Sequence, residues 1–284
     1  MAPGLAVRRI LTATPLARQH EHRLSGRVTH KHKPIPWASF DRSKYPAAAL
    51  ALACDAQSKL ALGEYGAVDL FAHLASAMTL NGVPFDLVAA ATRVPADEIR
   101  HADFALRMAK LLSDAEVTLQ VDRDGLRRRW KSDVSIEELD LLMLEVAAIG
   151  ETLACALLSG CLERATDPTA HALFASIVSD EVHHARLGWY YLAWRAPQWG
   201  RPERQRVADR AGELLVQTER RFWRGRDAPS ASRKAARALG VLESDGQREA
   251  VRAVVEDEIV PALDALGLGA SHAWRVRERG GLRG

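Results

Sequence analysis

The stretch SDEVHHARLGWYYLAW, residues 179–194, places two acidic residues and two histidines in a segment whose remainder is mostly apolar and helix-forming. It contains Glu181-x-x-His184, with Asp180 directly before the glutamate. Residues three apart lie on one face of a helix, so this carboxylate and this imidazole can ligate the same metal ion. A shell of oxygen and nitrogen ligands suits iron, manganese or zinc better than calcium. A single Glu-x-x-His pair is common on protein surfaces, so its meaning depends on the rest of the chain.

A second copy of the pattern occurs in Asp97-Glu98-Ile-Arg-His101. Each copy is preceded, one predicted helix earlier, by an isolated glutamate that follows a glycine, Glu64 for the first copy and Glu151 for the second. At about 1.5 Å per residue, Glu151 lies about 21 Å before the end of its helix, and Glu181 lies about 20 Å after the start of the next one. The two carboxylates are therefore expected at the same depth.

Four helices are predicted between residues 45 and 196, where alanine and leucine dominate. Asn81-Gly82 predicts a left-handed helix end, Ser135-x-x-Glu138 is a capping box, and Asp167-Pro168 is typical of a helix start. Pro95 is expected to kink or split the second helix. Short turns join the first two helices and the last two, so each pair should form an antiparallel hairpin, and the long link 113–134 should cross between the hairpins. The predicted helices are residues 46–80, 84–112, 135–165 and 168–195.

Three segments are expected along the chain. Residues 1–44 lack a sustained period and predict an irregular N-terminal arm, and residues 45–196 predict the helix bundle. Residues 197–284 predict further helices packed on that bundle, because no linker rich in serine or glycine separates them from it. Those helices are expected at 202–223, 230–239 and 245–266.

The composition, with 48% hydrophobic and 26% charged residues, is that of a globular protein, and the net charge of +3 indicates no nucleic-acid partner. The three cysteines lie in apolar helical stretches, which favours a reducing compartment, and the cytoplasm is expected. Charged residues interrupt the longest apolar runs, and the N-terminus lacks the apolar core of a secretory signal, so no membrane association is expected.

Four carboxylates in an apolar core cannot all remain ionised without cations, because burial and mutual repulsion oppose their charge. Two divalent ions would balance four glutamates and two histidines, with two glutamates bridging and the others terminal. The predicted metal ligands are Glu64, Glu98, His101, Glu151, Glu181 and His184.

Over residues 45–196 the chain resembles the ferritin-like superfamily of di-iron carboxylate proteins, which implies an all-α fold with a ferritin-like four-helix bundle. The string from Asp97 to His101 resembles the motif of bacterial multicomponent monooxygenases. That resemblance implies that Asp97 orients His184 and that Asp180 orients His101 across the bundle. His183 stands where the string has arginine. Arylamine N-oxygenases of this superfamily carry a further histidine at the position of Ile177, so that subgroup is disfavoured.

Other residues near the predicted ligands have alternative roles. His183 is a neighbour of the ligands or a packing residue, with a seventh-ligand role as the alternative, and Cys155 should face the metal cavity or simply fill space. Tyr191 lies on the face of His184, two turns along, where it could hydrogen-bond toward the centre, act as a redox-active tyrosine or serve as a core aromatic residue. The predicted substrate walls are Val68, Phe71, Ala72, Ala105, Cys155 and Phe174.

The leading functional hypothesis is an oxidase or oxygenase that uses two iron ions, cycling between Fe²⁺ and Fe³⁺, to activate O₂ for oxidation of a small organic molecule. Manganese or a mixed manganese–iron pair is an alternative metal content. The alternative functions are a ferroxidase or iron-handling protein, a di-manganese catalase-like enzyme and a helical module with a structural metal. An electron-donor protein and a homodimer are further expected associations.

Overall fold

The computed structural model describes residues 34–113, 117, 120, 133–222, 230–272 and 274, and this part of the chain is helical and contains no strand. The protein is therefore all-α over the described residues. The longer helices are α2 (Ala47–Leu80), α4 (Val94–Ser113), α7 (Glu151–Arg164), α8 (Pro168–Arg195) and α9 (Arg201–Phe222). The shorter ones are α3 (Phe85–Ala91), α6 (Ile136–Leu142), α10 (Ala231–Arg237), α11 (Ser244–Val254) and α12 (Val260–Ala265).

The helix ends follow the predicted local signals. Ser135 and Glu138 form the capping box that starts α6, since each side chain accepts a hydrogen bond from the other residue's backbone N–H. The Asp167 carboxylate caps α8 by accepting from the backbone N–H groups of Thr169 and Ala170. Gly82, with a φ of 66°, follows the end of α2 in the left-handed conformation that glycine tolerates. Pro95 is predicted to kink or to split the second helix. The helix is split, because α3 ends at Ala91 and α4 begins at Val94.

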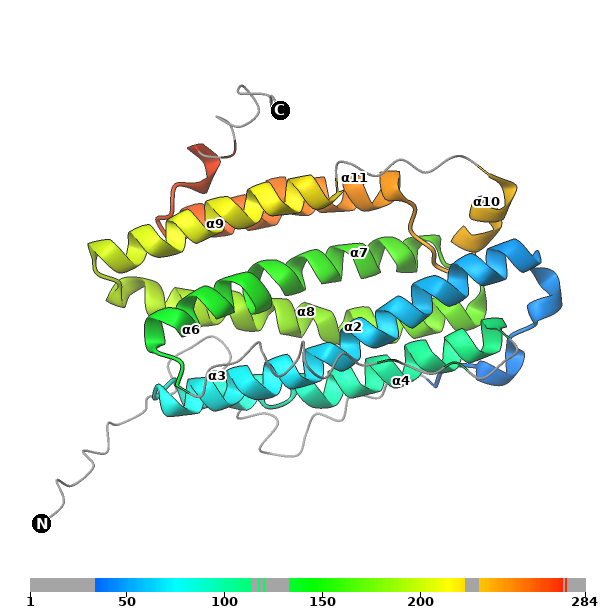
Figure 1. Ribbon diagram of the computed structural model, residues 1–284, viewed down its shortest axis with the longest axis horizontal. Coiled ribbons are helices and arrows are strands. Elements are labelled where there is room, and N and C mark those ends of the chain that lie inside the picture. The colour runs from blue at the N-terminus through cyan, green and yellow to red at the C-terminus, as the bar shows by residue number, and fades with distance from the viewer. Residues whose placement is uncertain are drawn as a thin grey trace, which may run out of the picture.

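The helices that carry the predicted ligands pack as two pairs. Helices α2 and α4 run side by side in opposite directions, and α7 pairs with α8 in the same way (Figure 1). Helix α4 also contacts α8, which brings the two pairs together. Ser113 at the end of α4 and Ile136 at the start of α6 lie at opposite ends of the molecule, whereas most of the predicted crossover between them lies outside the described residues (Figure 1).

The C-terminal helices cover the α6–α7 side of these pairs (Figure 1). Val251 and Ile259, from α11 and the π-helix η5 (Val255–Ile259), share one hydrophobic cluster with Leu144 and Ala148 of the third long helix. The C-terminal helices therefore complete the same core and do not build one of their own. The boundaries of the three predicted segments stay predictions.

A π-helix, η3 (Met143–Gly150), interrupts the third long helix between α6 and α7. Gly188 of α8 packs against it so closely that an added Cβ would lie 2.2 Å from Ala147 C and 2.2 Å from Ala148 N. Only glycine permits this approach of the two backbones. A wide turn within an α-helix is often found at functional sites, and this one ends directly before Glu151.

The continuous helical segment Ile136–Arg164, of 29 residues, contains an 18-residue window with a mean hydropathy of 1.9, so it is long and apolar enough to cross a membrane by length and composition alone. Charged residues, Glu145 and Glu151 among them, interrupt its apolar residues, as expected from the sequence for the longest apolar runs. The segment lies within the fold, where it packs against α8, α9 and α11, and Leu144 and Ala147 are fully buried. A core helix has the same composition, so the hydropathy of this segment is weak evidence for a membrane span.

The described end of the N-terminal arm lies on α8. The Tyr45 hydroxyl donates to Asp167 Oδ2 at 2.9 Å, and the Thr169 hydroxyl donates to the Pro36 carbonyl at 3.1 Å. The Pro36 bond attaches the arm to the first turn of α8, and the bond of Tyr45, the first residue after the arm, reaches the Asp167 cap. Residues 1–33, which make up the rest of the predicted arm, lie outside the described residues.

Candidate metal centre

The six predicted ligands converge at the centre of the paired helices. Each of two groups places one potential ligand atom per residue within 4.8 Å of the others. Glu98 and Glu181 belong to both groups. The first group is Glu64, Glu98, His101 and Glu181, and the second is Glu98, Glu151, Glu181 and His184.

The distances between the ligand atoms are nearly symmetrical about the two shared carboxylates. Glu98 places one oxygen 3.7 Å from His101 Nδ1 and the other 3.2 Å from His184 Nδ1. Glu181 does the same, at 3.0 Å from His101 Nδ1 and 3.4 Å from His184 Nδ1. Glu64 approaches only His101, at 3.9 Å, and Glu151 approaches only His184, at 4.0 Å. Two carboxylates thus face both histidines, while each remaining glutamate faces one.

The two aspartates lie behind the histidines, on the helix opposite each. Asp180 Oδ2 of α8 lies 3.2 Å from His101 Nε2, and Asp97 Oδ2 of α4 lies 3.4 Å from His184 Nε2. The structure thus brings together the pairs that the family resemblance implied. Arg100 joins them, because its guanidinium donates to Asp97 at 2.9 Å and to Asp180 at 2.6 Å. Sequence reasoning gave Arg100 no role, although the quoted Asp-Glu-x-Arg-His string contains it.

Two properties of the cluster suit it to bind cations: its side chains are buried, and several of their atoms lack hydrogen-bond partners among the described residues. The exposed fractions of its six side chains range from 0% for His101 to 12% for Glu151. Four atoms that face its centre have no hydrogen-bond partner among the described residues. Buried polar atoms without partners are rare in proteins, and coordination of a metal ion would satisfy these four. These atoms are Glu98 Oε2, His101 Nδ1, Glu181 Oε1 and His184 Nδ1.

The electrostatics of the cluster also favour positive charge. Burial raises the pKa of Glu64 and of Glu151 well above the ordinary value, and the neighbouring carboxylates add to the effect. Burial alone would lower the pKa of His101 and of His184, but the surrounding carboxylates hold both far above the usual range. Without metal, protons therefore balance the excess negative charge, and divalent cations would take their place.

Tyr191 and His183 do not join the cluster. The Tyr191 hydroxyl donates to Asp140 Oδ1 at 2.8 Å in a fully buried network that also includes Arg195 and Trp199. Of the three roles that the sequence left open for Tyr191, this observation favours the core aromatic residue with a satisfied hydroxyl over a hydrogen bond toward the centre. His183 is half-buried and belongs to neither ligand group.

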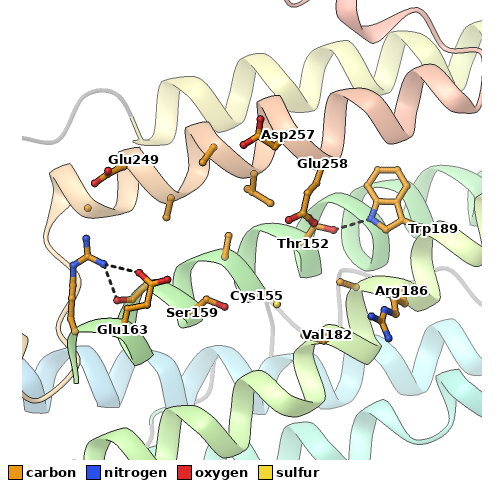
Figure 2. A pocket seen from close by; sticks show the side chains of 18 residues that line it. Thr152, Cys155, Ser159, Glu163, Val182, Arg186, Trp189, Glu249, Asp257 and Glu258 are labelled. Atoms are coloured by element: carbon orange, nitrogen blue, oxygen red, sulfur yellow. Dashed lines mark hydrogen bonds and ion pairs between the residues drawn. The ribbon is translucent and has the colours of Figure 1, made fainter. Parts of the chain in front are cut away.

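A pocket of about 660 Å³ lies between α7, α8 and the α11–η5 segment (Figure 2), and it is lined by the neighbours of two ligands, Thr152 and Val182, and by none of the ligands themselves. Among the predicted wall residues, only Cys155 lines this pocket, whereas Phe71, Ala105 and Phe174 are buried in the core. Burial raises the pKa of the free Cys155 thiol, and the carboxylates of Glu181 and Glu258 raise it further. Cys155 thus lies within electrostatic range of both the cluster and the far wall of the pocket.

Such an arrangement can hold two cations between a pair of shared carboxylates and can admit a small molecule next to them. Metal identity does not follow from it, because carboxylate and imidazole ligands accept iron and manganese alike. Comparisons with protein-family models, with curated proteins and with solved structures find no match to this chain.

Proposed function

We propose that the protein is a non-haem di-iron oxidase or oxygenase, built on a ferritin-like four-helix bundle, that uses O₂ to oxidise a small organic substrate. The observation that carries the proposal is the pair of ligand groups that share Glu98 and Glu181. A site for one ion needs no such sharing, whereas a dinuclear carboxylate site does.

Each residue would have a defined task around the two ions. Glu98 and Glu181 would contribute to holding both ions, together with Glu64 and His101 at one site and with Glu151 and His184 at the other. Two bound Fe²⁺ ions would supply the electrons that reduce O₂.

The aspartates would keep the histidine rings in the ligating orientation. Asp180 and Asp97 would each accept a hydrogen bond from the Nε2–H of a histidine, which leaves Nδ1 unprotonated and directed at the metal. Arg100 would hold both carboxylates in position and compensate their charge. Loss of such a supporting group typically lowers metal affinity or activity by roughly 10–100-fold.

The pocket supports an organic substrate over iron storage. Its volume of about 660 Å³ is within the range of small-molecule sites, and Thr152 and Cys155 in its wall are next to or one turn from Glu151. An iron-storage role requires no organic pocket at this position.

Metal stoichiometry tests the ligand assignment. After anaerobic loading with Fe²⁺ and removal of free metal, we expect two irons per chain in the wild-type protein and fewer than two in Glu181→Ala, because the variant lacks a shared ligand. Glu145→Ala is the matched control, since Glu145 lies on the same bundle but pairs with Arg210 at 2.6 Å, away from both ligand groups. Retention of both irons by Glu181→Ala would refute the assignment.

Reaction of the reduced protein with O₂ distinguishes the functions. Oxidation that stops at two irons per chain and is accelerated by a bound organic molecule is expected for the proposed enzyme. Continued iron uptake into a mineral would instead indicate a ferroxidase, and rapid peroxide dismutation with bound manganese would indicate a catalase. The electron-donor protein, the homodimer and the cytoplasmic location stay predictions.

A further inference from the structure

We propose that the pocket between α7, α8 and the α11–η5 segment is the substrate site of this centre and that it selects a small organic cation, whose ammonium group pairs with Glu258 beside the Trp189 ring. The substrate role rests on the proposed function. The preference for a cation rests only on the pocket's own residues.

The pocket shares two helices with the metal centre. Wall residue Thr152 directly follows the ligand Glu151, and wall residue Val182 directly follows the ligand Glu181. None of the six ligands lines the pocket, but Cys155, one turn after Glu151, does, and its neighbours Ala156 and Ser159 in the α7 wall are also small. A molecule in the pocket would therefore lie against residues of α7 and α8 that are next to the ligands or one turn from them.

The charge of the pocket wall is predominantly negative. Four carboxylates line it, from Glu163, Glu249, Asp257 and Glu258, against the guanidinium groups of Arg164 and Arg186. At one end Arg164 lies 3.9 Å from Glu163 and donates to the Gly160 carbonyl at 3.0 Å, so this positive charge is engaged there. Arg186 is exposed at the α8 rim.

Glu258 supplies an uncompensated negative charge at the other end. The residue is solvent-exposed, its carboxylate lines the pocket next to Thr152 (Figure 2), and it forms no ion pair with any of the described residues. Its negative charge reaches Cys155, in the wall that adjoins the centre. A positively charged ligand would thus find a partner at the same end of the pocket as the residues following Glu151.

Trp189 provides a fixed aromatic surface at that end. Its indole Nε1–H donates to the Thr152 hydroxyl at 2.9 Å (Figure 2), and that hydroxyl donates to the Ala148 carbonyl at 2.6 Å. The ring is therefore held in place before any ligand binds. A carboxylate beside a fixed indole ring is a combination that attracts ammonium groups through charge pairing and cation–π interaction.

Binding of three probes of equal size tests the charge preference. We expect the metal-free, full-length protein to bind 2-phenylethylammonium about tenfold more tightly than 2-phenylethanol, with phenylacetate weakest, when measured by isothermal titration calorimetry. Glu258→Gln should remove most of the difference between the ammonium and the alcohol. Glu256→Gln is the matched control, because Glu256 lies on the same π-helix but pairs with Arg252 at 2.9 Å outside the pocket, and this variant should bind as the wild type does.

A second measurement tests the substrate role separately. In protein loaded with Mn²⁺, we expect paramagnetic broadening of the bound 2-phenylethylammonium proton signals, because the pocket adjoins the ligand faces of α7 and α8. Equal or tighter binding of phenylacetate, or no effect of Glu258→Gln, would overturn the charge preference. Bound Mn²⁺ and bound probe without broadening would overturn the substrate role. Failure of the protein to bind Mn²⁺ or Fe²⁺ would instead refute the proposed function, and the ammonium preference would still be measured in the metal-free protein.

Discussion

Replacing Gly188 by alanine should separate the two elements that carry one half of the metal centre. The added Cβ would lie 2.2 Å from Ala147 C and Ala148 N, whereas ordinary contact begins at 3.4 Å, so α8 and η3 must move apart by about 1.2 Å. Both neighbours are backbone atoms, which cannot rotate out of the way. Overpacking of this kind costs about 1–3 kcal/mol or more, and the better helix propensity of alanine offsets about 1 kcal/mol of it. Because the clash is with backbone atoms, we take the upper end of this cost, about 3 kcal/mol, and expect a net loss of about 2 kcal/mol in the free energy of unfolding.

Urea and thermal unfolding measure this loss. For a chain of this size, about 2 kcal/mol corresponds to a decrease in Tm of roughly 4–8 °C. Gly212→Ala is the matched control, because Gly212 also lies within a long helix, α9, but an added Cβ there meets nothing within 4 Å. The control should gain about 0.5–1 kcal/mol. A Gly188→Ala variant as stable as the wild type would refute the reasoning from the close backbone approach.

The same substitution should weaken metal binding. Gly188 lies one turn after His184 on α8, and η3 ends directly before Glu151, so moving the two elements apart lengthens the 4.0 Å separation of these ligands. We expect a lower metal affinity in Gly188→Ala, measured by competition with a chelator, and an unchanged affinity in Gly212→Ala. Equal affinity in both variants would show that η3 does not position Glu151.

Two further predictions concern groups away from the centre. Arg195→Met should destabilise the protein by about 3–5 kcal/mol, because it leaves the buried Asp140 carboxylate without its cation. Tyr191→Phe removes only one hydrogen bond to Asp140 and should cost about 2 kcal/mol; equal losses in urea unfolding would contradict this ranking. Burial raises the pKa of the Cys161 thiol to about 12 in the folded chain, against 9.0 in the unfolded chain. The folded state therefore favours the neutral thiol, and this contribution to the free energy of unfolding is complete below pH 9.0 and is lost as the pH rises toward 12. At pH 9, alkylation of Cys161 by iodoacetamide should be roughly 500-fold slower in the folded than in the urea-unfolded chain, and similar rates would contradict burial.

The features that could be predicted from sequence are those fixed by local interactions. The capping box of Ser135 and Glu138 and the cap at Asp167 involve residues at most three positions apart, so the sequence contains the whole interaction. The π-helix η3 has no such local signal. It is packed against Gly188, about forty residues further along the chain, and sequence reasoning without that contact assigned one uninterrupted helix.

The same distinction separates the candidate ligands from the candidate substrate pocket. The distance from Glu151 to the end of α7 and the distance from the start of α8 to Glu181 are nearly equal, so the two carboxylates lie at one level. Both distances depend only on the hairpin that α7 and α8 form. Period also assigned Tyr191 to the face of His184, but it could not reveal that Asp140 of α6 binds the hydroxyl. The pocket depends on a still more distant placement, that of Glu258 opposite Thr152. The residues that would hold the metal therefore lie within the α2–α4 and α7–α8 pairs, whose spacing is regular. The residues that would select the substrate come partly from the helices that follow α8, so the selecting wall can change without altering the ligand set.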